Sequence, residues 1–273
     1  MKIKIFNPKE GMQGNDKNNI FIVMDEAGNY LGNGYVFEKI SEQLTPKHPI
    51  NIFIDVSLEE QYLYHQIGFE LFRLLYKRAN ELFEQSNYDT GLLYYGTEIK
   101  DEKFHFFRDQ GLTSDINSYQ MSRSTDIIRS DGLAYAILED MDHYEDIIRF
   151  HNDVLIKPID DSLIHQFSHK DNFKCITVKD NDNLIASMMI YSEEQHGIID
   201  HLIVHSDYKR QGIGKYLMSA AMSHFHKNFI STATLEVWSA NRIAMAFYEA
   251  IGFKVQKETE YYVGVLLGKK YKQ

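Results

Sequence analysis

The sequence predicts an α/β protein with mixed sheets, built as two domains in tandem. Segments with strand-like and helix-like apolar spacing alternate along the chain, as is typical of folds that combine sheets with covering helices. The same order of strands and helices occurs nearly twice. The chain has 273 residues, 44% of them hydrophobic, which is enough for two cores of ordinary size.

In the first half, short apolar runs between turn residues predict strands. These strands are residues 21–24, 30–37, 51–56, 91–95 and 117–121. Helical spacing of apolar residues predicts a helix over 59–85, and a shorter helix over 101–110 ends before Gly111. The polar segment 122–132 has no periodic apolar set. We therefore place the domain boundary there, with domains 1–127 and 128–273.

In the second half, strands and helices again alternate. The predicted strands are residues 133–138, 173–179, 184–191, 198–204, 232–238 and 261–267. The predicted helices are residues 144–154, 161–167, 212–226 and 242–251. Ser239 and Asn241 are both candidates for the N-cap of the last helix, because either side chain can accept a hydrogen bond from a first-turn amide.

The two halves align as a weak internal repeat. Gly68 aligns with Gly214, 146 residues later, and the segment from Phe106 to Leu112 aligns with Phe247 to Phe253 at an offset of 141. The order of elements is kept although few residues are identical. The pattern indicates a repeated domain whose first copy has diverged.

Composition excludes several classes of function. The net charge of −10 disfavours general binding to nucleic acid, because an acidic chain repels phosphate backbones. The one cysteine, Cys175, cannot form an intramolecular disulfide. No segment approaches the ~20 apolar residues of a membrane helix or resembles a signal peptide, so we expect a cytoplasmic protein without membrane contact. The oligomeric state stays open, with a homodimer as one alternative.

A basic turn with two glycines opens one predicted helix. Residues 209–214 read Lys-Arg-Gln-Gly-Ile-Gly and follow the strand that ends at Val204. Unpaired amides and the helix dipole favour an anion at such a helix start, and glycine allows close approach of a phosphate. The spacing fits neither the dinucleotide fingerprint nor the Walker loop. A tight turn before a core helix is the alternative interpretation.

This turn resembles the pyrophosphate-binding signature [QR]-x-x-G-x-[GA] of the GNAT superfamily of N-acetyltransferases. Lys209 departs from the first position but keeps the positive charge. Residues 241–253 resemble the family's downstream pattern N-x-x-A-x-x-F-Y-x-x-x-G-F. The resemblance covers residues 133–267 well and residues 20–121 only as a degenerate copy, so it implies two tandem GNAT-like domains.

The resemblance implies acetyl-CoA as co-substrate and no metal. His165 and His169 have a spacing that can hold a metal, but no further ligand pattern accompanies them, so we expect surface histidines. The family's thioester carbonyl is bound where two parallel strands separate, which maps here to the end of the strand at 198–204. The implied cofactor-binding residues are Leu202, Ile203, Val204, Lys209, Arg210, Gln211, Gly212, Ile213, Gly214, Lys215, Asn241 and Phe247.

For catalysis, the resemblance implies Tyr248 as the acid that protonates the departing thiolate. By position alone, Tyr248 would be a core aromatic residue. Asp200 and Glu236 are alternative general bases, and strand alternation predicts His201 on the opposite side of the sheet from Asp200. In the first copy, the segment from Leu63 to Gly68 lacks the basic residue and the first glycine, and Phe107 replaces the tyrosine. Residues 1–121 are therefore expected not to bind acyl-CoA.

The sequence thus predicts an N-acetyltransferase. The acetyl group would pass from acetyl-CoA to a primary amine by direct attack in a ternary complex, and a small-molecule acceptor is favoured over a protein. The alternative is a non-catalytic acyl-CoA sensor or a partner-binding module that keeps the cofactor turn without turnover.

Overall fold

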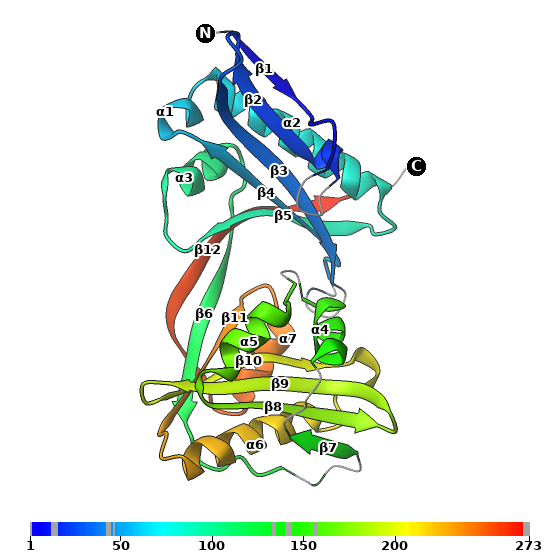
Figure 1. Ribbon diagram of the computed structural model, residues 1–273, viewed down its shortest axis with the longest axis vertical. Helices are drawn as coiled ribbons and strands as arrows, with labels where there is room; N and C mark the ends of the chain where they lie inside the picture. The colour runs from blue at the N-terminus through cyan, green and yellow to red at the C-terminus, as the bar shows by residue number, and fades with distance from the viewer. Residues whose placement is uncertain are drawn as a thin grey trace. The chain divides into compact units, whose positions relative to one another are not determined.

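The computed structural model describes residues 2–11, 16–41, 45, 47–130, 132, 135–139, 144–155 and 158–269 (Figure 1). Contacts divide the chain into two compact units, which are described separately below. Unit 1 comprises residues up to 117 together with those from 260 onward, and unit 2 comprises residues 118–259. No helix in the described ranges is long and apolar enough to cross a membrane.

Unit 1 is a twisted sheet covered by helices. Its strands, in spatial order, are β1 (Ile3–Phe6), β2 (Ile20–Asp25), β3 (Tyr30–Ile40), β4 (Ile50–Leu58), β5 (Thr90–Thr97) and the C-terminal part of β12 (Lys254–Gly268). Its helices are α1 (Glu60–Leu63), α2 (Gln66–Gln85) and α3 (Glu102–Asp109). Neighbouring strands are antiparallel except β4 and β5, which are parallel.

Two features of unit 1 were not predicted. The expected helix over 59–85 is divided at Tyr64 and His65, where the chain turns so sharply that a β-carbon on Gly68 would lie 1.9 Å from the carbonyl oxygen of Leu63. Strand β1 was also missed, because a four-residue strand carries little periodic signal.

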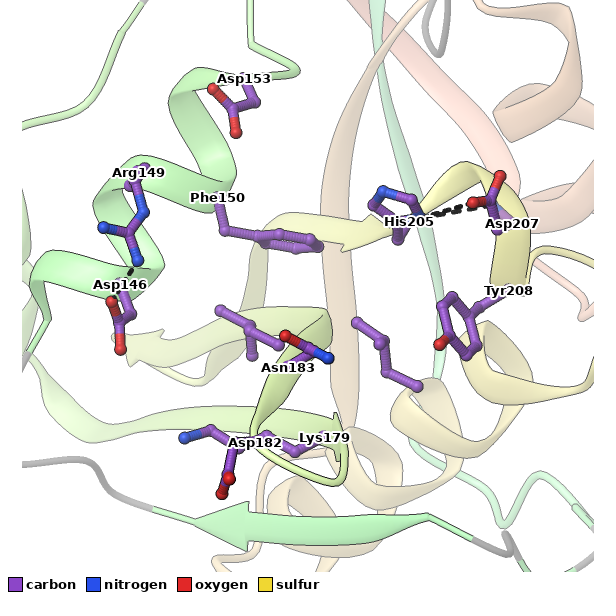
Figure 2. A pocket seen from close by; sticks show the side chains of 12 residues that line it. Asp146, Arg149, Phe150, Asp153, Lys179, Asp182, Asn183, His205, Asp207 and Tyr208 are labelled. Atoms are coloured by element: carbon purple, nitrogen blue, oxygen red, sulfur yellow. Dashed lines mark hydrogen bonds and ion pairs between the residues drawn. The ribbon is translucent and has the colours of Figure 1, made fainter.

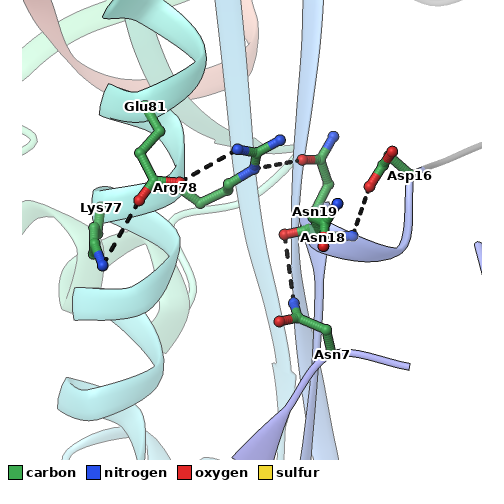
Figure 3. A network of polar contacts seen from close by, with 7 residues as sticks. All are labelled: Asn7, Asp16, Asn18, Asn19, Lys77, Arg78 and Glu81. Carbon is green, nitrogen blue, oxygen red and sulfur yellow. Dashed lines mark hydrogen bonds and ion pairs between the residues drawn. The ribbon is translucent and has the colours of Figure 1, made fainter. Parts of the chain in front are cut away.

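A polar network joins the N-terminal segment of unit 1 to helix α2 (Figure 3). The short 3₁₀ turn η1 (Lys17–Asn19) is capped by Asp16, whose side chain accepts a hydrogen bond from the amide of Asn18 at 2.7 Å. Arg78 of α2 donates to Oδ1 of Asn19 at 2.8 Å. These contacts hold the segment before β2 against the helix.

Unit 2 has the same kind of layering, with strands covered by helices. Its strands, in spatial order, are β6 (Ser114–Ser124, from residue 118), β11 (Thr232–Trp238), β10 (His196–Val204), β9 (Asn183–Glu193), β8 (Asp171–Asp180) and β7 (Ala136–Glu139). Its helices are α4 (Glu145–Asn152), α5 (Asp161–Ser168), α6 (Ile213–Lys227) and α7 (Arg242–Ala250). Only β10 and β11 are parallel neighbours among the pairs described in this unit.

The sheet of unit 2 separates two cores. Met188 and Ile190 of β9 pack in the cluster that contains α6 and Tyr248, while Met189 and Tyr191 pack in the cluster that contains α4 and α5. Successive side chains of a strand point to opposite faces. Helices α6 and α7 therefore cover one face of this sheet, and α4 and α5 cover the other.

The parallel pairs of the two units have the same register. In unit 1 the pair runs from Ile50 opposite Gly91 to Phe53 opposite Tyr94, and in unit 2 from His196 opposite Thr232 to Ile199 opposite Leu235. The corresponding residues differ by 146 and 141 positions, the two offsets found by aligning the halves. This agreement supports the repeat, and the divergence of unit 1 from a common domain stays a prediction.

Each unit takes one strand from the other half of the sequence. β6 follows α3 of unit 1 but pairs with β11 of unit 2, while β12 follows α7 of unit 2 but pairs with β5 of unit 1. The compact units therefore differ from the contiguous ranges 1–127 and 128–273. The segment 122–132, expected to be a linker, begins inside β6. Composition marks a polar stretch, but it does not reveal which strand a neighbouring segment pairs with.

Candidate active site

The centre of the candidate site is the point in unit 2 where β10 and β11 separate. Their pairing ends at Ile199 and Leu235, although both strands continue. A bulge lies in β10 between Asp200 and Ile203, and His201 within it has a positive φ of 49°. Beyond the bulge, β10 still pairs with β9. No described strand pairs with its other edge there, so backbone groups on that edge can bind an extended ligand.

The predicted strand-end residues lie at this opening. Leu202, Ile203 and Val204 form the last part of β10, beyond its pairing with β11. Ile203 is buried, whereas Leu202 and Val204 are half-buried. The expected separation of parallel strands is therefore present at the expected residues, while their contact with a cofactor stays a prediction.

The glycine turn sits at the start of α6. Gly212 is the N-cap with φ 85°, and no side chain caps the first turn of the helix. A β-carbon on Gly212 would have no heavy atom within 4 Å. First-turn amides of a helix lack intrahelical partners, so the open space in front of them is suited to an anion.

Side chains fix the shape of this turn. The hydroxyl of Tyr135 donates to Oε1 of Gln211 at 2.7 Å, and Nε2 of Gln211 donates to the carbonyl of Asp207 at 3.1 Å. Arg210 has a positive φ of 63°, and its side chain is exposed. Gln211 thus has a structural role in the turn in addition to the binding role expected of it.

Lys209 and Lys215 supply positive charge near the turn in different ways. Lys215 is exposed in the first turn of α6, where an ammonium can reach a bound phosphate. Lys209 is half-buried, and burial lowers the pKa of its ammonium because desolvation disfavours the charged form. An anion bound beside Lys209 would oppose that shift.

Helix α7 brings its N-terminus and two aromatic rings to the same region. Asn241 is the N-cap, since its Oδ1 accepts a hydrogen bond from the amide of Ala244 at 3.2 Å; this decides between the two predicted caps. A β-carbon on Gly214 would lie 3.4 Å from the Phe247 ring. The start of α6 and the ring of Phe247 are therefore neighbours, with room for a small side chain at position 214.

Tyr248 lies in the core beside this contact. It is 9% exposed, and its ring centroid lies 5.3 Å from that of Phe247 and 6.0 Å from that of Phe253. Burial raises the pKa of the phenol to about 12, so the hydroxyl stays protonated at neutral pH. No hydrogen bond from that hydroxyl to another described residue is recorded. Tyr248 is thus both a core aromatic residue and a group able to donate a proton.

The candidate bases lie at the opening on the α4 and α5 face. Asp200 follows Ile199, the last residue of β10 that pairs with β11. Glu236 is exposed on β11. Tyr191 of β9 is close enough to both carboxylates that its phenol pKa is raised, first by burial and then by their charges. Asp200 and Glu236, together with Glu193, therefore all act on the phenol of Tyr191.

The prediction that His201 and Asp200 face opposite sides of the sheet was wrong. Nδ1 of His201 lies 2.5 Å from Oδ1 of Asp200, in an electrostatic contact that is not aligned as a hydrogen bond. The bulge with its positive φ breaks the alternation of β10. As a result, the imidazole packs toward α4 and α5, with its centroid 5.7 Å from that of His151 and 6.0 Å from that of Phe167.

His151 is a part of this region that the sequence did not single out. It is fully buried on α4, and neither ring nitrogen has a hydrogen-bond partner among the described residues. Burial, and to a lesser extent the charge of His201, lowers its pKa to about 3. His151 is therefore neutral at physiological pH. Its place in the short α4 pattern gave no signal beyond that of a core position.

A separate cavity of about 450 Å³ lies between α4, the β8–β9 turn and the end of β10 (Figure 2). Four aspartates line it, against Arg149 and Lys179 as basic residues, and Phe150 extends toward the end of β10. Arg149 is already paired with Asp146 at 2.6 Å. The cavity contains none of the predicted site residues, and its acidic lining suits a cation or a neutral polar molecule.

The corresponding opening in unit 1 is filled by side chains. Lys103 of α3 lies 3.1 Å from Oδ1 of Asp55 and also donates to the carbonyl of Val56 at 3.3 Å, both on β4 beyond its pairing with β5. Tyr95 stacks on Phe107 with a centroid distance of 4.6 Å. In unit 1 the ammonium of Lys103 therefore binds a carboxylate and a backbone carbonyl beyond the parallel pair, and two stacked rings fill the adjoining space. In unit 2 the corresponding opening is available to a ligand.

Other predicted features lie away from the site. His165 and His169 are both exposed, with Nδ1 of His169 2.7 Å from the carbonyl of His165. No group of three or more potential metal ligands occurs in the part of the chain that the structure describes. Cys175 is fully buried in β8.

Comparison with known proteins identifies the domain. Residues 138–253 match the family model of the Acetyltransferase (GNAT) family. Separated parallel strands beside an uncapped glycine turn, on this fold, define a GNAT-type acyltransferase domain. The protein accordingly carries a domain of the GNAT acetyltransferase family within residues 138–253.

Individual relatives match less of the chain. Over 53 residues it is 38% identical to the ribosomal protein bS18-alanine N-acetyltransferase of Escherichia coli strain K12; the match covers 19% of this chain and 36% of that enzyme. The chain thus spans about a third of the length of this curated relative.

Solved structures show the same fold. A GCN5-related N-acetyltransferase from Anabaena variabilis has a TM-score of 0.54 at 11% identity, covering 91% of this chain and 62% of that one. A conserved protein from Enterococcus faecalis has a TM-score of 0.55 at 9% identity, covering 89% and 61%.

Proposed function

We propose that unit 2 transfers an acetyl group from acetyl-CoA to a primary amine, by direct attack in a ternary complex. The observation that carries this proposal is the opening between β10 and β11 next to the uncapped glycine turn of α6. The opening offers backbone groups to an extended arm, and the turn offers amides to a pyrophosphate. Acetyl-CoA contains both parts.

In this proposal the cofactor lies along the end of β10 and the start of α6. Amides of residues 212–215 bind the pyrophosphate, with charge from Lys209, Arg210 and Lys215. Leu202 to Val204 bind the pantetheine arm by their backbone, and a backbone amide there polarises the thioester carbonyl. Asn241 and Phe247 support the same region through α7.

Acyl transfer also requires proton movements. The C–N bond forms as the amine attacks, and the C–S bond breaks as the thiolate departs. Tyr248 gives the thiolate its proton. Although the phenol pKa is about 12, the thiolate forms in the same buried surroundings, where desolvation also raises the pKa of a thiol. Asp200 and Glu236 supply negative charge on the side from which the amine arrives.

The acceptor is proposed to be a small cationic or neutral amine rather than a protein. The carboxylates Asp200 and Glu236 near Tyr191 support this choice, because negative charge favours a cation there. The name of the Escherichia coli relative states a ribosomal protein alanine as acceptor, and the shared stretch is 53 residues long. A terminal α-amine therefore belongs in the panel of amines to be tested.

Unit 1 is proposed to be a supporting domain that binds no acyl-CoA. Lys103, Asp55 and the stacked Tyr95 and Phe107 fill its opening. We propose a cytoplasmic location for the whole protein, and neither nucleic acid nor membrane as a partner. Light scattering on the purified full chain measures whether it forms a homodimer.

The experiment is a thiol-release assay with acetyl-CoA and a panel of primary amines, run on the full chain. Turnover that depends on the amine supports the transferase. Binding of acetyl-CoA without thiol release for any amine favours the alternative, a non-catalytic acyl-CoA sensor. The burial of Tyr248 is the observation that favours this second function, because a core tyrosine needs no catalytic role.

A further inference from the structure

The bulge in β10 gives His201 a position that differs from those of the two candidate bases, Asp200 and Glu236. It lies two residues beyond the last residue paired with β11, next to the residues proposed to hold the pantetheine arm. Its side chain is 18% exposed, so it is partly enclosed but still accessible. Asp200, the carboxylate nearest along the strand, contacts the imidazole at 2.5 Å.

The contact with Asp200 fixes which ring nitrogen carries the proton of the neutral imidazole. Nδ1 faces the carboxylate oxygen at 2.5 Å. A lone pair on Nδ1 would be repelled by that oxygen, whereas an N–H is attracted to it. The proton therefore resides on Nδ1, and Nε2 keeps its lone pair. No hydrogen bond to Nε2 from another described residue is recorded.

Resting on the proposed function, we infer that His201 is the general base of acetyl transfer and that Asp200 is its positioning residue. Nε2 of His201 takes the proton that the attacking amine loses as the C–N bond forms. The C–S bond breaks, and the thiolate takes a proton from Tyr248. Solvent then carries the proton from His201 to the Tyr248 phenolate, so both groups return to their starting states.

The surroundings of His201 allow it to become positively charged during this step. Asp200 on β10 stabilises the imidazolium, while His151 on α4 stays neutral, with a pKa of about 3. Phe167 on α5 bounds the ring without charge. Tyr191 on β9, whose phenol pKa is raised, lies near Glu193 as well as Glu236 on β11. The one cation recorded against Tyr191 among the described residues, the ammonium of Lys170, lies 5.7 Å from its ring and is paired with Glu193 at 2.5 Å.

His201 and Tyr248 lie in clusters on opposite faces of the unit 2 sheet. The pairing of β10 with β11 ends at Ile199 and Leu235, so the two strands separate between these faces. A base on one face and an acid on the other suit an amine that arrives from the α4 and α5 side and a thioester that arrives from the α6 and α7 side. Asp200 and Glu236 thereby act through charge rather than by direct contact with the acceptor.

The test compares the full-length wild type with His201→Gln, Asp200→Asn and, as a matched surface control, His226→Gln. Each protein is titrated with acetyl-CoA and assayed for amine-dependent thiol release from pH 5.5 to 9. For His201→Gln we expect unchanged acetyl-CoA affinity, kcat reduced about 100-fold at neutral pH, and loss of the wild-type acidic limb. For Asp200→Asn we expect a lower kcat with KM nearly unchanged, and wild-type values for His226→Gln.

A second measurement does not depend on turnover. Long-range ¹H–¹⁵N NMR of the imidazoles should show His201 as the Nδ1–H tautomer in the wild type, and a mixture of tautomers in Asp200→Asn. It should also show His151 still neutral at pH 5.5. A wild-type His201 with its proton on Nε2 would overturn the assignment, even if His201→Gln failed to fold.

The outcomes separate the two proposals. If the wild type turns over and His201→Gln matches its rate and pH profile, His201 is not the base, while the proposed function stands. If the wild type binds acetyl-CoA but releases no thiol with any amine, the transferase function fails and the assignment fails with it.

Discussion

The ammonium of Lys103 lies 3.1 Å from the carboxylate of Asp55 in unit 1, beyond the point where β4 leaves β5. In unit 2 the same register leads to the opening, where Asp200 contacts the imidazole of His201 instead of an ammonium. Burial raises the pKa of the Asp55 carboxyl, and Lys103 opposes that shift. The pair thus belongs to the core structure of unit 1 rather than to a binding site.

Replacing Lys103 should therefore affect stability and leave cofactor binding unchanged. Lys103→Ala leaves a largely buried carboxylate without its partner, and we expect a loss of about 1 kcal/mol in the free energy of unfolding. Acetyl-CoA affinity should not change. Urea denaturation and calorimetry measure the two quantities. Lys77→Ala is the control, since Lys77 is exposed and lies 3.7 Å from Glu81. A large loss of acetyl-CoA affinity in Lys103→Ala would place a cofactor site in unit 1.

Substitutions at Gly212 should separate the effect of bulk from that of charge. Gly212→Asn and Gly212→Asp add side chains of equal size into open space, at a φ of 85° that asparagine and aspartate tolerate better than most residues. Both should weaken acetyl-CoA binding, and Asp more than Asn, by at least about tenfold, because its carboxylate faces the pyrophosphate. Calorimetry measures the affinities. Equal affinity for the two variants would argue against a phosphate at this turn.

Removing the Tyr248 hydroxyl should reduce turnover and spare binding. Tyr248→Phe keeps the ring contacts with Phe247 and Phe253, so the fold and the acetyl-CoA affinity should be nearly unchanged. Loss of the proton donor should lower kcat about 100-fold. The thiol-release assay measures this effect. Unchanged kcat would remove Tyr248 from the mechanism and leave it as a core residue only.

The exchange of strands predicts how fragments behave. A fragment of residues 128–273 lacks β6, and with it Met121, which is fully buried in the core beside β11. We expect this fragment to be unfolded or aggregated, because the edge of β11 is left without its partner. A fragment of residues 114–273 keeps β6 and should retain more structure by circular dichroism and NMR. A well-folded 128–273 fragment would show that β6 is dispensable.

Burial of His151 predicts a dependence of stability on pH. Its pKa in the folded protein is about 3, well below the roughly 6.5 of an unfolded histidine. Because the folded pKa is depressed, the histidine's contribution is fully present above pH 6.5 and is lost as the pH falls toward 3. Between pH 7.5 and 5 the loss should be about 2 kcal/mol.

His151→Leu should remove that part of the pH dependence. The free energies of unfolding of the wild type, of His151→Leu and of His226→Gln, whose histidine is exposed, are compared at both pH values. The control should follow the wild type. If His151→Leu loses as much stability as the wild type between pH 7.5 and 5, His151 is not held neutral in the native state.

Much of the fold was predictable because its signals are local. Strand β11 has the bounds predicted for it, and the turn at Gly212 does open a helix. The pairing of β6 with β11 was not predictable, since a strand's apolar pattern does not identify its neighbour. The orientation of His201 was predicted wrongly for a related reason. Alternation holds only for a regular strand, and the bulge at Asp200 is set by pairing with β9.

The most direct test of the account is calorimetric titration of the full-length chain with acetyl-CoA, together with Gly212→Asp. We predict one binding site per chain in the wild type, and its loss in the variant, whose melting temperature falls only by the small strain of a non-glycine residue at a φ of 85°. Two sites per chain would show that the filled opening of unit 1 also binds acyl-CoA. Absence of binding, or binding that Gly212→Asp leaves intact, would contradict the proposed cofactor site in unit 2.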